Sequence, residues 1–180
     1  MVAKLVLVLG GASCGKTALA QQMTERWGES PAYIATAEPF DPEMKEKIHR
    51  HRATRGDNWI TIEEPLKIAE ILQDQGDWNA VLIDCLTMWV MNLIIADTDV
   101  TNATVNLIDA AIGCPVPVVM VSGETGMGIV PSGKLSRQFS QELGQVNQLI
   151  ASQANLVILT VAGLPIALKG SIPECLQSTM

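Results

Sequence analysis

The feature that most constrains this chain is residues 10–17, which read Gly-Gly-Ala-Ser-Cys-Gly-Lys-Thr. A glycine, four residues and then Gly-Lys-Thr form a phosphate-binding loop when a strand precedes them and a helix follows. The apolar run 5–9 predicts a buried strand, and residues 17–27 predict a helix with its apolar side chains on one face. In that setting the N–H groups of the loop and of the helix N-terminus converge on phosphate oxygens. The sequence therefore predicts a nucleotide-binding protein.

Two side chains of the loop and one acid downstream have separate predicted roles. Lys16 is expected to bridge the terminal phosphates, and Thr17 to place its hydroxyl on Mg2+. Asp84 directly follows the apolar run 81–83, as the acid of a Walker B strand does, and is predicted to hold the same Mg2+. The alternative for Asp84 is a cap on the helix that follows. The loop residues predicted to contact nucleotide are Gly10, Gly11, Ala12, Ser13, Cys14, Gly15, Lys16 and Thr17.

Further apolar runs without polar alternation predict more buried strands, separated by helices. The predicted strands are 5–9, 31–36, 59–62, 81–84, 116–121 and 156–161. The predicted helices are 17–27, 41–55, 65–75, 86–96, 101–112 and 135–154. After residue 161, Gly163 and Pro165 are expected to break regular structure. This pattern predicts an α/β fold whose central sheet is largely parallel and has helices on both faces.

Ligands of such sheets bind at the carboxyl ends of the strands. That rule places Thr36, Glu63, Asp84 and the glycine-rich stretch 122–128 along the same edge as the phosphate loop. The longest apolar region, 80–96, contains Asp84 and Asn92. It is therefore predicted to form a strand and a helix rather than a membrane span.

Composition narrows the class of protein. The 180 residues are predicted to form one P-loop nucleotide-binding catalytic domain, 1–180. With 12 basic and 19 acidic residues the net charge is −7, which argues against nucleic acid or an anionic membrane as the main partner. The four cysteines are scattered without a Cys-x-x-Cys pair, so reduced thiols in a cytoplasmic protein are expected.

The segment 45–55 is the second informative stretch. It holds five of the twelve Lys and Arg residues and both histidines. Such a patch in an acidic protein favours an anionic substrate, and a solvated helix face is an equal alternative. On a helix, His51 and Arg55 share a face. From spacing alone, His51 could orient phosphates, attack phosphorus to form a phosphoramidate, or only pack.

Several blocks occur in an order that resembles one family, the bifunctional adenosylcobinamide kinase/adenosylcobinamide-phosphate guanylyltransferases of cobalamin biosynthesis. The resemblance covers about residues 5–169. The matching blocks are 10–17, 33–37, 43–55, 59–65, 84–93, 126–131, 144–148 and 162–165.

This resemblance implies an enzyme with two reactions. A nucleoside triphosphate, ATP or GTP, first phosphorylates the aminopropanol hydroxyl of the corrinoid adenosylcobinamide. GTP then transfers GMP to that phosphate, which releases pyrophosphate and leaves adenosylcobinamide-GDP. The second reaction is expected to pass through a guanylylated histidine, matched by His51, with Lys16 as the other catalytic residue. The resemblance also implies a RecA-like P-loop NTPase fold and a homotrimer.

The same resemblance assigns nucleotide contacts beyond the loop. These are Thr36, Ala37, Glu38, Arg52, Ala53, Thr54, Arg55, Glu63 and Asp84. Two rival functions are a P-loop kinase of a small metabolite, in which His51 only binds phosphate, and a nucleotide-dependent regulatory module without a transfer reaction. The first predicts no covalent nucleotide adduct. The second predicts nucleotide binding without corrinoid-dependent turnover.

Overall fold

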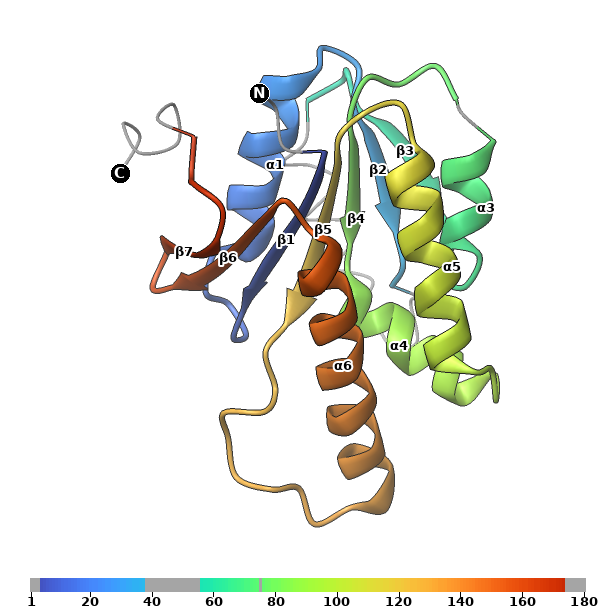
Figure 1. The fold of residues 1–180 in the computed structure, drawn as a ribbon, viewed down its shortest axis with the longest axis vertical. Helices are drawn as coiled ribbons and strands as arrows, with labels where there is room; N and C mark the ends of the chain where they lie inside the picture. The colour runs from blue at the N-terminus through green and yellow to red at the C-terminus, as the bar shows by residue number, and fades with distance from the viewer. Residues whose placement is uncertain (1–3, 38–55, 75, 174–180) are drawn as a thin grey trace.

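A single mixed sheet organises the computed structural model, which describes residues 4–37, 56–74 and 76–173 (Figure 1). The strand order is β3-β2-β4-β5-β1-β6-β7. The strands are β1 (Leu5–Gly10), β2 (Ala32–Ala35), β3 (Ile60–Glu63), β4 (Val81–Asp84), β5 (Val118–Gly123), β6 (Leu156–Val161) and β7 (Leu164–Lys169). Neighbours from β3 to β6 pair in parallel, and only β7 runs antiparallel, against β6.

Helices cover both faces of this sheet. They are α1 (Lys16–Trp27), α3 (Ile68–Gln73), α4 (Leu86–Ile95), α5 (Val100–Gly113) and α6 (Lys134–Gln153). Figure 1 shows α1 on one side of the sheet and α3, α5 and α6 on the other. Two apolar clusters agree with this division, one between the sheet and α1 and one between the sheet and the remaining helices. The predicted α/β fold is therefore confirmed.

The strand that enters the phosphate loop shows why its sequence lacks polar alternation. All six residues of β1 are buried. Leu5, Leu7 and Leu9 belong to the cluster under α4, α5 and α6, whereas Val6 and Val8 belong to the cluster under α1. A strand covered on both faces has no solvent side, so its sequence is continuously apolar.

The predicted apolar region 80–96 forms β4 and α4, as expected. Within the described ranges, none of the helices has both the length and the apolar character that crossing a bilayer requires. The predicted helix 65–75 is real but shorter, Ile68–Gln73. Its first turn is replaced by a turn in which a Glu64 carboxylate oxygen accepts from the N–H groups of Leu66 and Lys67, at 2.9 and 2.8 Å. The predicted helix 41–55 lies outside the described residues.

The prediction that regular structure ends after residue 161 is wrong. Leu164–Lys169 forms β7, joined to β6 by a two-residue turn across the Val161 and Leu164 pair. Ala162 and Gly163 both have positive φ, 51° and 80°, which is the geometry of a tight hairpin. Pro165 is tolerated because β7 is the last strand of the sheet, where a missing N–H breaks no ladder.

Candidate active site

The phosphate loop joins the end of β1 to the start of α1. Gly15 has φ 96° and ψ 5°, a left-handed conformation that favours glycine. A Cβ on Gly10 would lie 2.5 Å from the carbonyl oxygen of Thr160, so a side chain has no room there. The Lys16 ammonium donates to the Gly11 carbonyl at 2.6 Å, so the lysine side chain folds back over the loop. Gly10 and Gly15 therefore permit the backbone conformation of the loop.

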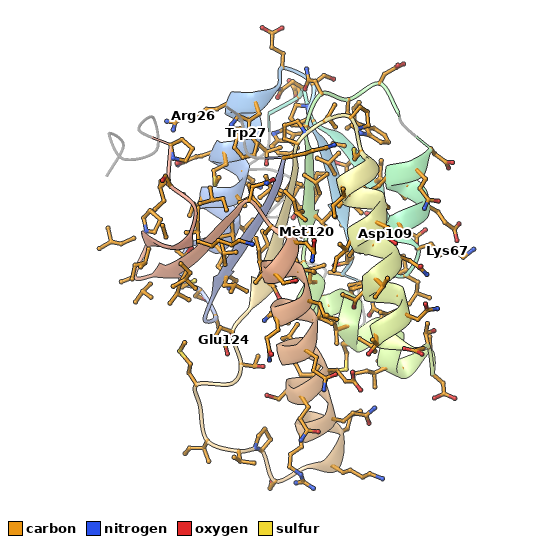
Figure 2. The ribbon with its side chains drawn as sticks, viewed as in Figure 1. Arg26, Trp27, Lys67, Asp109, Met120 and Glu124 are labelled. Carbon is orange, nitrogen blue, oxygen red and sulfur yellow. The ribbon has the colours of Figure 1, made fainter. Side chains whose placement is uncertain are left out.

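Two neighbouring segments hold the loop from outside. The Gly163 N–H of the β6–β7 turn donates to the Cys14 carbonyl at 2.9 Å. The Glu124 N–H, just past β5, donates to the Gly10 carbonyl at 3.0 Å. Figure 2 shows Glu124 where the chain leaves the sheet after β5. Two segments that are far apart in the sequence thus fix the shape of one loop.

Beside the loop, the carboxyl ends of four strands form a row. In the strand register, Val121 pairs with Asp84, Asp84 with Ala35, and Ala35 with Glu63. Partners in register point to the same face, and these share the face of Leu82, which packs under α1. With strands about 4.8 Å apart, the Cα atoms of Asp84 and Glu63 lie roughly 10 Å apart. The small Ala35 leaves space between the two acids.

The loop and this row enclose one cavity of about 560 Å³. That volume suits a nucleotide-sized ligand. The cavity is lined by these predicted site residues: Gly10, Ala12, Ser13, Cys14, Gly15, Lys16, Thr17, Ala37, Glu63 and Asp84. Gly11 and Thr36 do not line it. Glu38, His51, Arg52, Ala53, Thr54 and Arg55 lie outside the described residues.

Thr36 is fully buried behind the cavity. Its hydroxyl donates to the Cys85 carbonyl at 2.7 Å and accepts from the Cys85 N–H at 2.8 Å. The Asn92 side-chain amide donates to the Thr36 carbonyl at 2.8 Å. Through these contacts Thr36 holds the backbone that follows Asp84 in place. A nucleotide contact at Thr36 stays a prediction.

Comparison with known proteins decides the family. Residues 6–168 match the family model described as cobinamide kinase / cobinamide phosphate guanyltransferase. The chain belongs to this family.

Relatives in the family support the match over nearly the whole length. The chain is 41% identical over 167 residues to the bifunctional adenosylcobalamin biosynthesis protein CobP of Pseudomonas aeruginosa, covering 91% of this chain and 96% of the relative. It is 37% identical over 183 residues to the bifunctional adenosylcobalamin biosynthesis protein CobU of Escherichia coli, covering 92% and 99%.

Comparison with solved structures concerns the fold of the chain. The flagellar accessory protein FlaH of Methanocaldococcus jannaschii aligns with TM-score 0.53 and 14% identity, covering 94% of this chain and 81% of FlaH. The P4 protein of bacteriophage phi6, in complex with ADP, aligns with TM-score 0.50 and 15% identity, covering 91% and 52%. At such identities the likeness concerns the fold alone, a largely parallel sheet with helices on both faces. The family match and the two bifunctional relatives show that the chain is an enzyme.

The donors in the cavity suit a magnesium ion held partly by substrate. Within residues 4–37, 56–74 and 76–173, no three His, Cys, Asp or Glu side chains gather closely enough to hold a metal by themselves. Mg2+ commonly takes only one or two protein oxygens and completes its shell with phosphates and water. The Thr17 hydroxyl and the Asp84 carboxylate line the same cavity and are oxygen donors of that kind.

The surroundings of Asp84 exclude the alternative that this residue caps helix α4. The N-cap residue of α4 is Cys85. The Asp84 carboxylate instead accepts a hydrogen bond from the Tyr33 hydroxyl at 2.8 Å.

Burial raises the pKa of the Cys85 thiol, and the neighbouring Asp84 charge raises it further. This thiol therefore stays protonated at neutral pH and is no candidate nucleophile.

Sequence reasoning missed the part that Tyr33 plays. The residue was counted as one position of a predicted strand and of the family block 33–37, without a role of its own. Its signal is a hydroxyl-bearing side chain two residues before the end of β2, beside a strand that ends in aspartate. That pairing of β2 with β4 is a matter of topology, which the sequence pattern does not contain.

Proposed function

We propose that this chain performs both reactions that its family's name describes. It phosphorylates the aminopropanol hydroxyl of adenosylcobinamide with ATP or GTP, and it then transfers GMP from GTP to the product, giving adenosylcobinamide-GDP. The observation that carries the proposal is the single cavity in which the phosphate loop meets Asp84 and Glu63. Relatives over nine-tenths of the chain are named as bifunctional enzymes of adenosylcobalamin biosynthesis, which supports two activities on one domain.

The chain's own residues would orient the triphosphate. The N–H groups of the loop and the N-terminus of α1 bind phosphate oxygens, and Lys16 reaches the terminal ones. Thr17 and Asp84 would hold Mg2+, which when bound neutralises charge on the phosphates and on the leaving group. Glu63, across Ala35 from Asp84, lies at the same end of the sheet as a further acid.

The second reaction would use His51 as a covalent carrier. A ring nitrogen attacks the α-phosphorus of GTP, the bond to the bridging oxygen breaks, and pyrophosphate leaves. A phosphate oxygen of the phosphorylated corrinoid then attacks the same phosphorus, the nitrogen–phosphorus bond breaks, and GMP is transferred. The family resemblance supports this role, as does the position of His51 in a basic segment of the sequence that begins soon after the cavity residue Ala37.

One labelling experiment tests the proposal. Wild-type protein is incubated with α-labelled GTP and denatured, and the label on protein is measured with kinase turnover. His51→Asn should lose the adduct and slow GMP transfer on the order of 10^4-fold or more, yet phosphorylate adenosylcobinamide within roughly tenfold of wild type. His49→Asn is the matched control and should keep both activities. Lys16→Ala should lose both, because both need the triphosphate bound in one loop.

The chemistry of the label adds a second criterion. A phosphoramidate should lose its label in acid and keep it in base. Label that persists on His51→Asn, or that survives acid, would contradict the histidine carrier and favour a simple kinase. We further propose that the enzyme is cytoplasmic, in line with its scattered cysteines, and homotrimeric, in line with its family resemblance.

A further inference from the structure

A buried phenol holds the carboxylate that is proposed to bind metal. The Tyr33 hydroxyl donates to Asp84 Oδ2 at 2.8 Å. Tyr33 is 5% exposed and lines the same cavity as Lys16 and Thr17. Hydrogen bonds to an ionised carboxylate are the strong ones, so this contact fixes the side-chain rotation of Asp84.

The ring of Tyr33 is itself held in place. It meets the buried ring of Trp59 edge to face, with centroids 6.0 Å apart and planes at 78°. Trp59 Nε1 donates to Glu25 Oε1 at 3.1 Å. Glu25 belongs to α1, the helix that starts at Lys16. A continuous line of contacts therefore runs from the helix of the phosphate loop to Asp84.

The backbone of the same aspartate is fixed independently. Asp84 ends a strand of only four residues, and Thr36 binds both the N–H and the carbonyl of the next residue, Cys85. Tyr33 of β2 thus holds the Asp84 side chain, and Thr36, just after the end of β2, holds the backbone that follows Asp84. A metal-binding carboxylate placed in this way is pre-organised before substrate arrives.

We propose that Tyr33 is a positioning residue, whose hydroxyl orients the Asp84 carboxylate toward the divalent cation of a metal–triphosphate bound in the phosphate loop. The inference rests on the proposed function, because it assumes that Asp84 is a metal ligand. It adds a residue whose hydroxyl contacts the carboxylate proposed to bind metal. Its effect should appear in metal affinity, because its hydroxyl orients the proposed metal ligand Asp84.

The test measures metal binding directly. Tyr33→Phe removes the hydroxyl and keeps the ring against Trp59. Binding of Mn2+ is followed by electron paramagnetic resonance, with the protein saturated by a non-hydrolysable GTP analogue. We expect Mn2+ to bind roughly 10- to 100-fold more weakly than to wild type, the usual effect of losing an outer-sphere partner. Kinase turnover should recover toward wild type as Mg2+ is raised.

The matched control is Thr104→Val. Thr104 is a fully buried hydroxyl that donates to the Val100 carbonyl at 2.7 Å within α5, and it does not line the cavity. Its loss should lower stability and leave Mn2+ affinity unchanged. Equal weakening in Tyr33→Phe and Thr104→Val, or unchanged affinity in Tyr33→Phe, would overturn the inference.

A second variant covers a failure of Tyr33→Phe to fold. Trp59→Phe keeps an aromatic ring but removes the bond to Glu25 and part of the ring that packs against Tyr33. It should weaken Mn2+ binding about 2- to 5-fold, because Tyr33 is then held less firmly. Unchanged affinity there would overturn the inference. Absence of any protein-bound label in wild type, with Mn2+ weakened in Tyr33→Phe, would refute the proposed histidine carrier and leave the positioning role standing.

Discussion

Two adjacent glycines of the phosphate loop have different physical reasons to be there. Gly10 has φ 155°, and a Cβ built on it would lie 2.5 Å from both the Thr160 carbonyl oxygen and the Cys14 sulfur. The Thr160 oxygen cannot move freely, since it belongs to the backbone of a residue that pairs with Gly10 in the sheet. A Cβ on Gly11 would meet nothing within 4 Å. The pattern requires the first glycine, whereas the space around the second allows a side chain.

The first prediction compares these two positions. Gly10→Ala should lower the free energy of unfolding by about 1–3 kcal/mol, as overpacking against backbone does, and should weaken GTP binding. Gly11→Ala is the control and should stay within about 0.5 kcal/mol of wild type. Urea unfolding and GTP titration of both variants measure the difference. Equal stability of the two variants would show that the loop has more room than the contacts indicate.

Individual residues of the site divide into those that a pattern predicts and those that only packing reveals. Lys16, Thr17 and Asp84 were predicted because a local spacing carries their chemistry, and all three line the cavity. Tyr33 was not predicted to act on Asp84, because 51 positions separate the two residues in sequence. Thr36 was placed at the correct edge, but no pattern shows that its hydroxyl binds the Cys85 backbone.

At the scale of elements, the hairpin of β6 and β7 differs most from the sequence-based expectation. Gly163 and Pro165 were interpreted as breakers of regular structure, and they lie in and just after a hairpin turn. The turn also donates the Gly163 N–H to Cys14, so it supports the phosphate loop. Ala162 sits in the same turn with φ 51°, a conformation that alanine disfavours.

The second prediction changes this turn. Ala162→Asn should raise the free energy of unfolding by about 0.5–1 kcal/mol, because asparagine accepts positive φ and Asn-Gly suits a two-residue hairpin. Ala162→Val should lower it, since a β-branched residue resists the same conformation. Thermal unfolding of the two variants provides the measurement. A gain in stability with valine would contradict the turn geometry.

Element types were predictable in this chain because most strands and helices have a strong hydrophobic pattern, even where they are short. Continuous apolar runs gave the parallel strands, and both faces of β1 are covered as expected. Boundaries were less predictable, as in α3, where Glu64 replaces the first turn of the predicted helix. The antiparallel β7 was missed because glycine and proline signals do not distinguish a hairpin from a loop.

The whole molecule leaves an apolar surface at one end of the sheet. Leu164, Ile166 and Leu168 are all at least half exposed on β7, and their spacing of two puts them on one face. β7 is an edge strand, so its outer backbone has no partner strand within the sheet. Exposed apolar stripes of this kind are typical of surfaces that contact another chain. The proposed trimer gives this stripe a reason to exist.

The last prediction tests that assembly. Sedimentation equilibrium at micromolar concentration should give three times the 19.3 kDa of the chain. Ile166→Lys should shift the mass toward the monomer, because a charge in the centre of the stripe is costly to bury. Val105→Lys is the control, since it places the same charge at an exposed apolar position on α5. A monomeric wild type would contradict the trimer, and a trimeric Ile166→Lys would place the subunit contact on another surface.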